Sequence, residues 1–167
     1  MHVLILGMTE SGKTTLAKRL IAEYSAKEIS SIVLDPINHE ANNWGADYVT
    51  NNPQEFLKVY WESKCCAAFF DESADYCGRH DKDFILTATK GRHWGHINHY
   101  LAQRGTLISN TVRDQCGRIF LFASSLNDCK THADEWNCPE FLKVPSLPKG
   151  TCYTKTRFGE PALIKLF

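Results

Sequence analysis

Residues 3–14 of this 167-residue chain read Val3-Leu4-Ile5-Leu6-Gly7-Met8-Thr9-Glu10-Ser11-Gly12-Lys13-Thr14, and they give the clearest indication of its architecture. The four leading apolar residues predict a buried strand. Residues 7–14 have the G-x-x-x-x-G-K-[ST] spacing of a phosphate-binding loop. Apolar residues at helical intervals follow it, at Leu16, Ala17, Leu20, Ile21 and Tyr24. A strand, a glycine-rich loop and a helix in this order favour a phosphate site over a glycine-rich turn with a purely structural role.

Each part of this loop suits a nucleoside triphosphate. The glycines let the backbone curl so that its N–H groups point inward, and the helix that follows adds the positive end of its dipole. Lys13 can reach the β- and γ-phosphates, and the Thr14 hydroxyl can coordinate Mg²⁺. We therefore expect ATP and Mg²⁺ as ligands, with the phosphates held by Thr9, Glu10, Ser11, Gly12, Lys13, Thr14 and Thr15.

The composition excludes several classes of protein. Nineteen basic and nineteen acidic residues give a net charge of zero, so DNA contact requires a local patch or several subunits. Seven cysteines with no C-x-x-C pair and no signal peptide in front indicate reduced thiols in the cytosol. No apolar run approaches the roughly 20 residues of a membrane span. We expect one domain over residues 1–167, with a core to about residue 136 and an extension over 137–167.

Short apolar runs alternate with helical patterns along the chain. Strands are predicted at 31–35, 65–70, 96–102 and 118–123, and helices at 53–62, 81–90, 107–115 and 128–136. Strands that are apolar throughout indicate an α/β fold with a mostly parallel sheet covered on both faces. The segments 151–157 and 162–167 flank Phe158-Gly159-Glu160-Pro161 and predict a terminal hairpin, which extends the sheet, covers its edge or docks a neighbour.

Two adjacent acids follow the apolar run that ends at Phe70. Asp71 at the end of a strand can hold Mg²⁺ beside Thr14, and Glu72 can orient and deprotonate an attacking water. This pair favours hydrolysis over phosphate transfer to a small hydroxyl, and the alternative is that the acids only cap the next helix. Gln103 follows the next central strand, where an amide can touch the γ-phosphate and the water, although an ordinary loop glutamine is equally common.

A family resemblance connects these motifs. In order along the chain come Gly91-Arg92, Gly95-His96-Ile97, Leu101-Ala102-Gln103-Arg104, Gly117-Arg118-Ile119-Phe120 and Ser124-Ser125-Leu126-Asn127-Asp128. This order resembles the second half of the FtsK/HerA-type DNA-pumping ATPases. Together with the P-loop and the two acids, the resemblance spans roughly residues 2–135. It implies a RecA/ASCE-like P-loop NTPase fold, with a central, mostly parallel sheet flanked by helices and a C-terminal β-hairpin.

The resemblance also implies a role for each matching residue. Lys13 and Thr14 would hold phosphate and Mg²⁺, and Asp71 would bind the metal. Glu72 would be the catalytic base, and Gln103 would sense the γ-phosphate. The implied activity is an ATPase coupled to DNA translocation.

Such ATPases act as rings, usually hexamers, in which an arginine of one subunit reaches the γ-phosphate held by its neighbour. That guanidinium stabilises charge in the transition state. Arg92 and Arg118 both match family arginines, and the choice between them stays open. Further possibilities are Arg79, Arg104 and Arg113. For each arginine the alternative is a surface ion pair with no catalytic part.

A bare motor of this length is similar to the genome-packaging ATPases of tailless, membrane-containing viruses. We expect none of the membrane anchor, accessory domain or winged-helix DNA reader of the cellular members. The similarity implies a ring on double-stranded DNA without sequence readout, contact with capsid or vertex proteins, and a place in the host cytoplasm or at a virion vertex. The alternatives are a P-loop nucleotide kinase, a Zot-like phage assembly ATPase, and a protein that binds ATP to assemble without hydrolysing it.

Two further groups of residues have both a functional and a structural interpretation. The loop 77–82 can face the pore of a ring and touch DNA phosphates, or it can simply be solvated. A zinc site is disfavoured because its candidate ligands are irregularly spaced, at Cys129, His132, Cys138 and Cys152.

Histidines and tryptophans are assigned to structure. His93, His96 and His99 are expected on different faces, as ordinary polar or partly buried side chains. The four tryptophans favour core or interface anchors over platforms for stacking bases, at Trp44, Trp61, Trp94 and Trp136.

Overall fold

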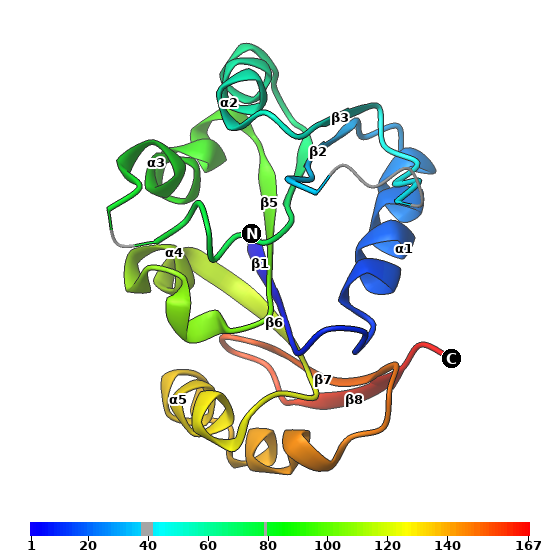
Figure 1. Ribbon diagram of the computed structural model, residues 1–167, viewed down its shortest axis with the longest axis vertical. Coiled ribbons are helices and arrows are strands. Elements are labelled where there is room, and N and C mark those ends of the chain that lie inside the picture. The colour runs from blue at the N-terminus through cyan, green and yellow to red at the C-terminus, as the bar shows by residue number, and fades with distance from the viewer. Residues whose placement is uncertain (38–41, 79) are drawn as a thin grey trace.

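The computed structural model describes residues 1–37, 42–78 and 80–167. A sheet runs through its centre in the order β3-β2-β4-β5-β1-β6-β7-β8 (Figure 1). The strands are β1 (His2–Leu6), β2 (Ser31–Leu34), β3 (Tyr48–Thr50), β4 (Ala67–Phe70), β5 (Ile97–Ala102), β6 (Cys116–Phe122), β7 (Thr151–Thr156) and β8 (Ala162–Lys165). Strands β1 to β6 pair in parallel, whereas β7 and β8 pair antiparallel. The predicted α/β fold with a mostly parallel sheet is confirmed.

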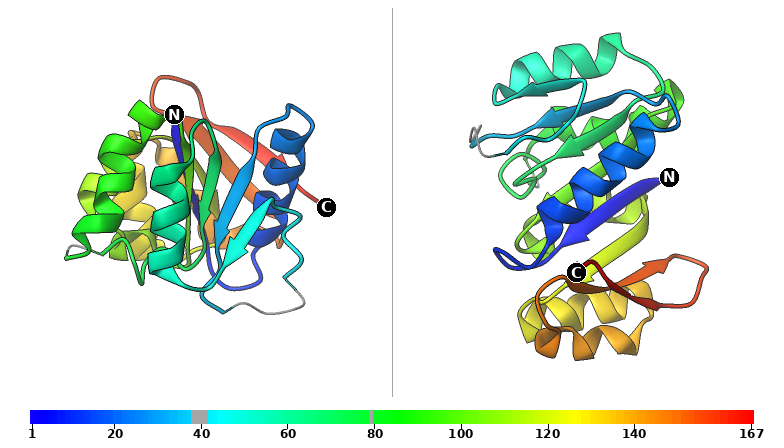
Figure 2. Two further views of the ribbon diagram at one scale, coloured as in Figure 1. Left: turned by 90° about the horizontal axis from the view of Figure 1, so that it is seen from above. Right: turned by 90° about the vertical axis from the view of Figure 1, so that its right-hand side faces the viewer.

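Helices cover both faces of the sheet (Figure 1). They are α1 (Lys13–Ser25), α2 (Pro53–Glu62), α3 (Lys82–Lys90), α4 (Asn110–Gln115) and α5 (Leu126–Trp136), with 3-10 segments η1 (Gly91–Trp94), η2 (Gly105–Leu107) and η3 (Pro139–Ser146). Helix α1 packs on one face, and the other helices pack on the opposite face. The hairpin of β7 and β8 lies at one end of the sheet, beside α5 and η3 (Figure 2).

Two apolar cores explain why the central strands are apolar throughout. Along β1, Leu4 and Leu6 belong to the core under α2–α5, while Val3 and Ile5 belong to the core under α1. A strand that is covered on both faces has no solvent side, so its residues do not alternate between apolar and polar. The same reasoning applies to β4, whose four residues are all buried.

Local capping fixes the start of two helices. The Asn52 side chain accepts hydrogen bonds from the amides of Gln54 and Glu55. Pro53 then occupies the first helical position, where its missing N–H costs nothing. Helix α5 begins in a similar way, because the Ser125 hydroxyl accepts from the Asp128 amide. This cap starts α5 at Leu126, two residues before the predicted start.

The strand order brings the P-loop and the two acids to the same edge of the sheet. Strand β5 lies between β1, which leads into the P-loop, and β4, which leads into Asp71. The Gly7 amide donates to the Ala102 carbonyl at 3.2 Å, and the Ser73 amide donates to the Leu101 carbonyl at 2.8 Å. The carboxyl end of β5 is therefore tied to both neighbouring loops.

Some boundaries differ from the prediction. The helix expected at 107–115 is split into η2 and α4, with Ile108 and Ser109 extended between them. The expected strand 96–102 starts one residue later, because the His96 amide donates to the Gly91 carbonyl at 3.2 Å and the ladder begins with the Ile97 amide. The hairpin extends the sheet through β6, which was one of its three predicted roles.

Helix length also bears on membranes. Within the part of the chain that the structure describes, every helix is too short or too polar to cross a bilayer.

Candidate active site

Packing against β6 shapes the P-loop. The Met8 amide donates to the Ala123 carbonyl at 2.8 Å, which holds the loop against the end of β6. A Cβ on Gly7 would lie 2.6 Å from the Phe122 Cβ, and one on Gly12 would lie 3.0 Å from the Phe122 ring. Gly12 also has a φ of 122°, a backbone angle that residues with a side chain rarely adopt. Both glycines of the motif are therefore required by the backbone path.

Lys13 turns back into the loop. Its Nζ donates to the carbonyls of Gly7 at 2.7 Å and Met8 at 3.0 Å. Burial lowers the pKa of this ammonium, and the charges of Glu72 and Asp71 oppose that shift. Helix α1 begins at Lys13, and its first amides have no intrahelical acceptor. The loop therefore offers the positive surroundings that suit a phosphate chain.

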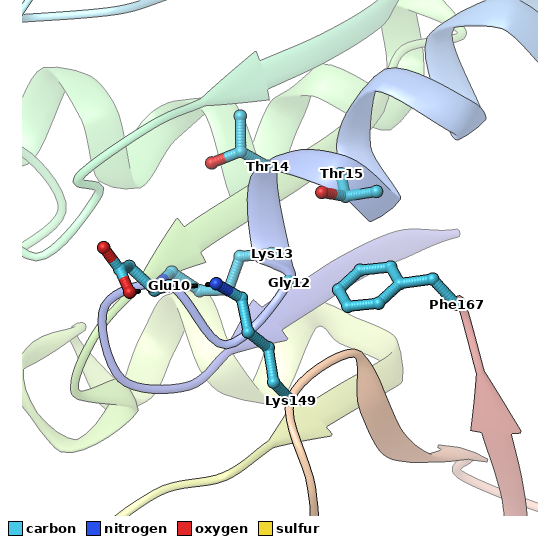
Figure 3. Close-up of a pocket in the computed structure, with 7 residues that line it drawn as sticks. All are labelled: Glu10, Gly12, Lys13, Thr14, Thr15, Lys149 and Phe167. Carbon is cyan, nitrogen blue, oxygen red and sulfur yellow. Dashed lines mark ion pairs between the residues drawn. The ribbon is translucent and has the colours of Figure 1, made fainter.

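A pocket of about 230 Å³ opens beside the loop (Figure 3). It is lined by Glu10, Gly12, Lys13, Thr14, Thr15, Lys149 and Phe167. Five of these were predicted from the sequence as phosphate-binding residues. Lys149 and Phe167 were missed, because they come from the last segment of the chain and no local pattern connects them to the loop. Lys149 pairs loosely with Glu10 at 3.7 Å, with both side chains mostly exposed.

The remaining predicted phosphate-binding residues also lie in or next to this loop. Thr9 is exposed, and Ser11 is buried with a hydroxyl that has no hydrogen-bond partner among the described residues.

Asp71 and Glu72 follow β4 directly, as predicted. Asp71 is buried, and burial raises the pKa of its carboxyl to about 6, with further contributions from the charges of Glu72 and Asp35. Glu72 is partly exposed and has a φ of 47°, so the chain turns sharply between the two acids. No helix begins at this pair in the described residues, because turns follow and α3 starts at Lys82. The alternative that the pair only caps the next helix is therefore wrong.

Gln103 meets Glu72 at the edge of the sheet. Its Nε2 donates to Glu72 Oε1 at 3.3 Å. Ser73 fixes this arrangement, because its hydroxyl is fully buried and donates to the Leu101 carbonyl at 2.7 Å. A second pocket of about 460 Å³ opens beside the pair, bordered also by Arg104. A water-sized reactant can therefore reach Glu72 and Gln103 from solvent.

Asp35 is a further acid at this edge that sequence reasoning missed. It follows β2 as Asp71 follows β4, and its carboxylate accepts from Trp44 Nε1 at 2.8 Å and from Asn42 Nδ2 at 3.2 Å. The available signal was its place at the end of an apolar strand. Leu34 pairs with Phe70, so Asp35 and Asp71 follow neighbouring strands at the same edge of the sheet, and the charge of Asp35 contributes to the raised pKa of Asp71.

The two main arginine candidates lie away from the P-loop of their own chain. Arg118 sits opposite Val3 near the start of β6, roughly 13 Å along the strand from Phe122. Its Nε donates to Thr154 Oγ1 at 3.1 Å, and its guanidinium lies 4.5 Å from the Phe120 ring centre. Arg92 is exposed in η1, before the amino end of β5. A catalytic part for either arginine therefore requires a neighbouring subunit and stays a prediction.

The other arginines have different surroundings. Arg113 is buried and binds Glu135 through Nε and Nη2, so it is a structural residue. Arg104 is half exposed and pairs with Asp128 at 3.5 Å. Arg79, a further arginine candidate, lies outside the described residues, as does that part of the loop 77–82.

The zinc candidates are not brought together. Cys129 and Cys138 are buried on the face under α2–α5, whereas Cys152 is buried on the face under α1. His132 Nδ1 instead contacts Glu135 Oε2 at 3.3 Å.

The histidines and tryptophans that the sequence assigns to structure lie as follows. His99 is fully buried, stacks on the Phe69 ring at 4.1 Å, and has its pKa lowered to about 3 by burial. His96 is buried and His93 is exposed. Trp44 and Trp136 are core residues, and the rings of Trp61 and Trp94 meet edge to face at 5.2 Å.

Comparisons with known proteins match the P-loop segment and the fold. A family model described as "Helicase HerA, central domain" matches residues 1–40. No curated protein sequence matches the chain significantly.

Solved structures match over nearly the whole chain. The genome packaging NTPase B204 from Sulfolobus turreted icosahedral virus 2, in complex with AMPPCP, is 18% identical with a TM-score of 0.83, covering 99% of this chain and 97% of that one. The pCW3 conjugation coupling protein TcpA is 14% identical with a TM-score of 0.72, covering 99% and 60%. The Thermomonospora curvata secretion ATPase EccC is 12% identical with a TM-score of 0.71, covering 99% and 23%.

The loop and the sheet order define a P-loop NTPase fold. Within that class, the chain has the fold of the FtsK/HerA superfamily of ATPases, as the resemblance implied.

Proposed function

We propose that the chain hydrolyses ATP at the P-loop and uses the free energy to move double-stranded DNA as a viral genome-packaging motor. The observation that carries this proposal is the meeting of Lys13, Asp71, Glu72 and Gln103 at the carboxyl ends of three neighbouring strands. The similarity of the fold to B204, a genome packaging NTPase, supports the choice of packaging among the tasks of such motors.

Each residue of the site has a separate role in ATP hydrolysis. Lys13 exchanges its two loop carbonyls for phosphate oxygens, and the loop amides bind the same chain. Glu72 accepts the proton of the attacking water, and the Gln103 amide orients that carboxylate through the 3.3 Å contact. Mg²⁺, when bound with the nucleotide, neutralises phosphate charge, and the Thr14 hydroxyl and the Asp71 carboxylate are the oxygen ligands it prefers.

A ring, with six subunits, completes the site in this proposal. Neither Arg118 nor Arg92 reaches the P-loop of its own chain. In the ring, one of them reaches the γ-phosphate held by the neighbouring subunit. The ring encloses double-stranded DNA without reading its sequence, and several subunits together supply the local basic contacts that a chain with no net charge needs to bind phosphates. It works in the host cytoplasm and docks through capsid or vertex proteins at a virion vertex.

ATP turnover with and without duplex DNA tests the proposed activity. Glu72→Gln should lower the rate by about 100-fold or more, because the general base is lost, while binding of ATP with Mg²⁺ remains. Glu62→Gln is the matched control, since Glu62 is exposed at the end of α2. Transfer of phosphate from ATP to a nucleoside monophosphate would contradict the proposal and favour a kinase.

Mixed subunits test the arginine. Adding an Arg118→Ala or Arg92→Ala subunit to a Lys13→Ala subunit should restore part of the activity, because an intact P-loop and an intact arginine then meet at some interfaces. A mixture of Lys13→Ala with Glu72→Gln is the control, since both residues act in the same chain and no interface is restored. No recovery in either arginine mixture counts against both candidates.

A further inference from the structure

We propose that Phe167 is the stacking platform for the base of the bound nucleotide. The proposal rests on the proposed function, since it names the base subsite of the same nucleotide site. It also gives the segment after β8 a part in binding that no sequence pattern indicated.

The shape of the pocket gives the first argument. Its walls run from Lys13 and Thr14 at one end to Phe167 at the other, and the ring of Phe167 faces the loop in Figure 3. The phosphates occupy the end with the amides and Lys13. The base must therefore lie farther along the wall, toward Thr15 and the phenyl ring.

The ring itself gives the second argument. Phe167 is 56% exposed while lining a pocket whose other residues are glycine, threonine and charged side chains. A half-exposed phenyl ring in a polar wall leaves apolar surface in contact with water unless a flat apolar group covers it. A nucleotide base supplies such a group, because every base has a π-face that stacks on an aromatic side chain.

The support of the ring gives the third argument. The Gly150 amide donates to the Ser11 carbonyl at 2.9 Å, and the Leu166 amide donates to the Gly150 carbonyl at 2.8 Å. A Cβ on Gly150 would lie 2.6 Å from Phe167 Cε2, so the ring rests directly on the glycine backbone. Arg19 Nη2 also donates to the Leu166 carbonyl at 2.6 Å. The ring is thus joined to the P-loop and α1 before any ligand binds.

Stacking predicts a particular selectivity. A phenyl ring distinguishes little among bases, because it contacts their faces rather than their hydrogen-bonding edges. Nucleoside triphosphates with different bases should therefore share the contribution of Phe167, while a ligand without a base should lack it.

Binding calorimetry with two ligands tests the proposal. The ligands are a non-hydrolysable ATP analogue and inorganic tripolyphosphate, each with Mg²⁺. Phe167→Ala should weaken binding of the analogue by about tenfold and leave tripolyphosphate within about twofold. Phe158→Ala is the matched control and should change neither, because Phe158 is fully exposed in the turn between β7 and β8.

The outcomes separate this proposal from the function beneath it. If Lys13→Ala weakens both ligands while Phe167→Ala weakens neither, the base subsite is refuted and the phosphate site stands. An equal change in both ligands for Phe167→Ala, whether loss or gain, also refutes stacking, since the ring then supports or covers the whole pocket. If Lys13→Ala weakens neither ligand, the proposed function fails.

A second variant keeps the test independent of folding defects. Phe167→Trp should retain affinity for the analogue, and its added indole emission should be quenched by the analogue and not by tripolyphosphate. Unchanged emission at a saturating concentration of the analogue would overturn the proposal.

Discussion

Asp71→Asn should make the protein more stable while it removes metal binding. The pKa of the Asp71 carboxyl is raised from 3.8 to about 6, because the group is buried and lies near the charges of Glu72 and Asp35. At about 1.4 kcal/mol for each pKa unit, the ionised carboxylate costs the folded state about 3 kcal/mol at pH 8. Asparagine carries no charge, and its Oδ1 can still accept the 3.1 Å hydrogen bond from the Glu72 amide.

The size of this effect depends on pH. The folded pKa of Asp71 lies above the unfolded one, so the folded state binds the proton more tightly, and the contribution of Asp71 to stability falls as pH rises from about 4 to 6. Urea denaturation with EDTA at pH 8 should show Asp71→Asn about 1–3 kcal/mol more stable, and roughly half of that gain at pH 5.

A control variant isolates the cause. Asp75→Asn lies on the same turn but is exposed, so its stability should stay within about 0.5 kcal/mol of the wild type. A loss of stability in Asp71→Asn at pH 8, or a gain that does not shrink at pH 5, would refute the electrostatic reasoning.

Three more predictions follow from the site and the core. Gln103→Ala should lower kcat about 10- to 100-fold with little change in KM for ATP, because Gln103 contacts Glu72 rather than the P-loop. A steady-state assay in which KM alone rises would contradict this prediction. Gly7→Ala should cost about 2 kcal/mol more in urea denaturation than Gly45→Ala. Both glycines have a positive φ, but a Cβ on Gly7 would meet Phe122 at 2.6 Å, while one on Gly45 would meet no heavy atom of the described residues within 4 Å; equal losses would contradict the packing argument. Burial lowers the pKa of His2 to about 4, so the unfolded state takes up the proton first as pH falls from 7 to 5, and the contribution of His2 to the free energy of unfolding should fall by about 2 kcal/mol. His2→Gln should therefore lose less stability than the wild type over this range, and an equal loss would assign the effect to other groups.

Much of the site could be predicted because its signals are local. The P-loop spacing fixes a backbone path in which Gly7 and Gly12 leave no room for side chains. The acids could be placed because Asp71 directly follows an apolar run, and the carboxyl ends of parallel strands share one edge. Gln103 was a weaker signal, since only the strand order places β5 between β1 and β4.

Other features depend on contacts distant in the sequence. Phe167 reaches the P-loop only through Gly150 and the pairing of β7 with β8. Arg113 is chemically the same as the other candidate arginines, and only its contact with Glu135, 22 residues away, shows that it is structural.

Short or irregular elements were missed for a different reason. Strand β3 has three residues, too few to show a period. Segment η3 contains Pro145, which disfavours the prediction of a helix. In both cases the element is held by the sheet or by α5 rather than by its own sequence.

Displacement of a third strand from duplex DNA tests the central claim most directly. A labelled triplex-forming oligonucleotide is released only when a motor moves along the duplex beneath it. The wild type should release it with ATP and Mg²⁺, and should not with a non-hydrolysable analogue or as Lys13→Ala. ATP hydrolysis by the wild type without any release, under conditions where duplex DNA is bound, would contradict the assignment as a DNA-moving ATPase.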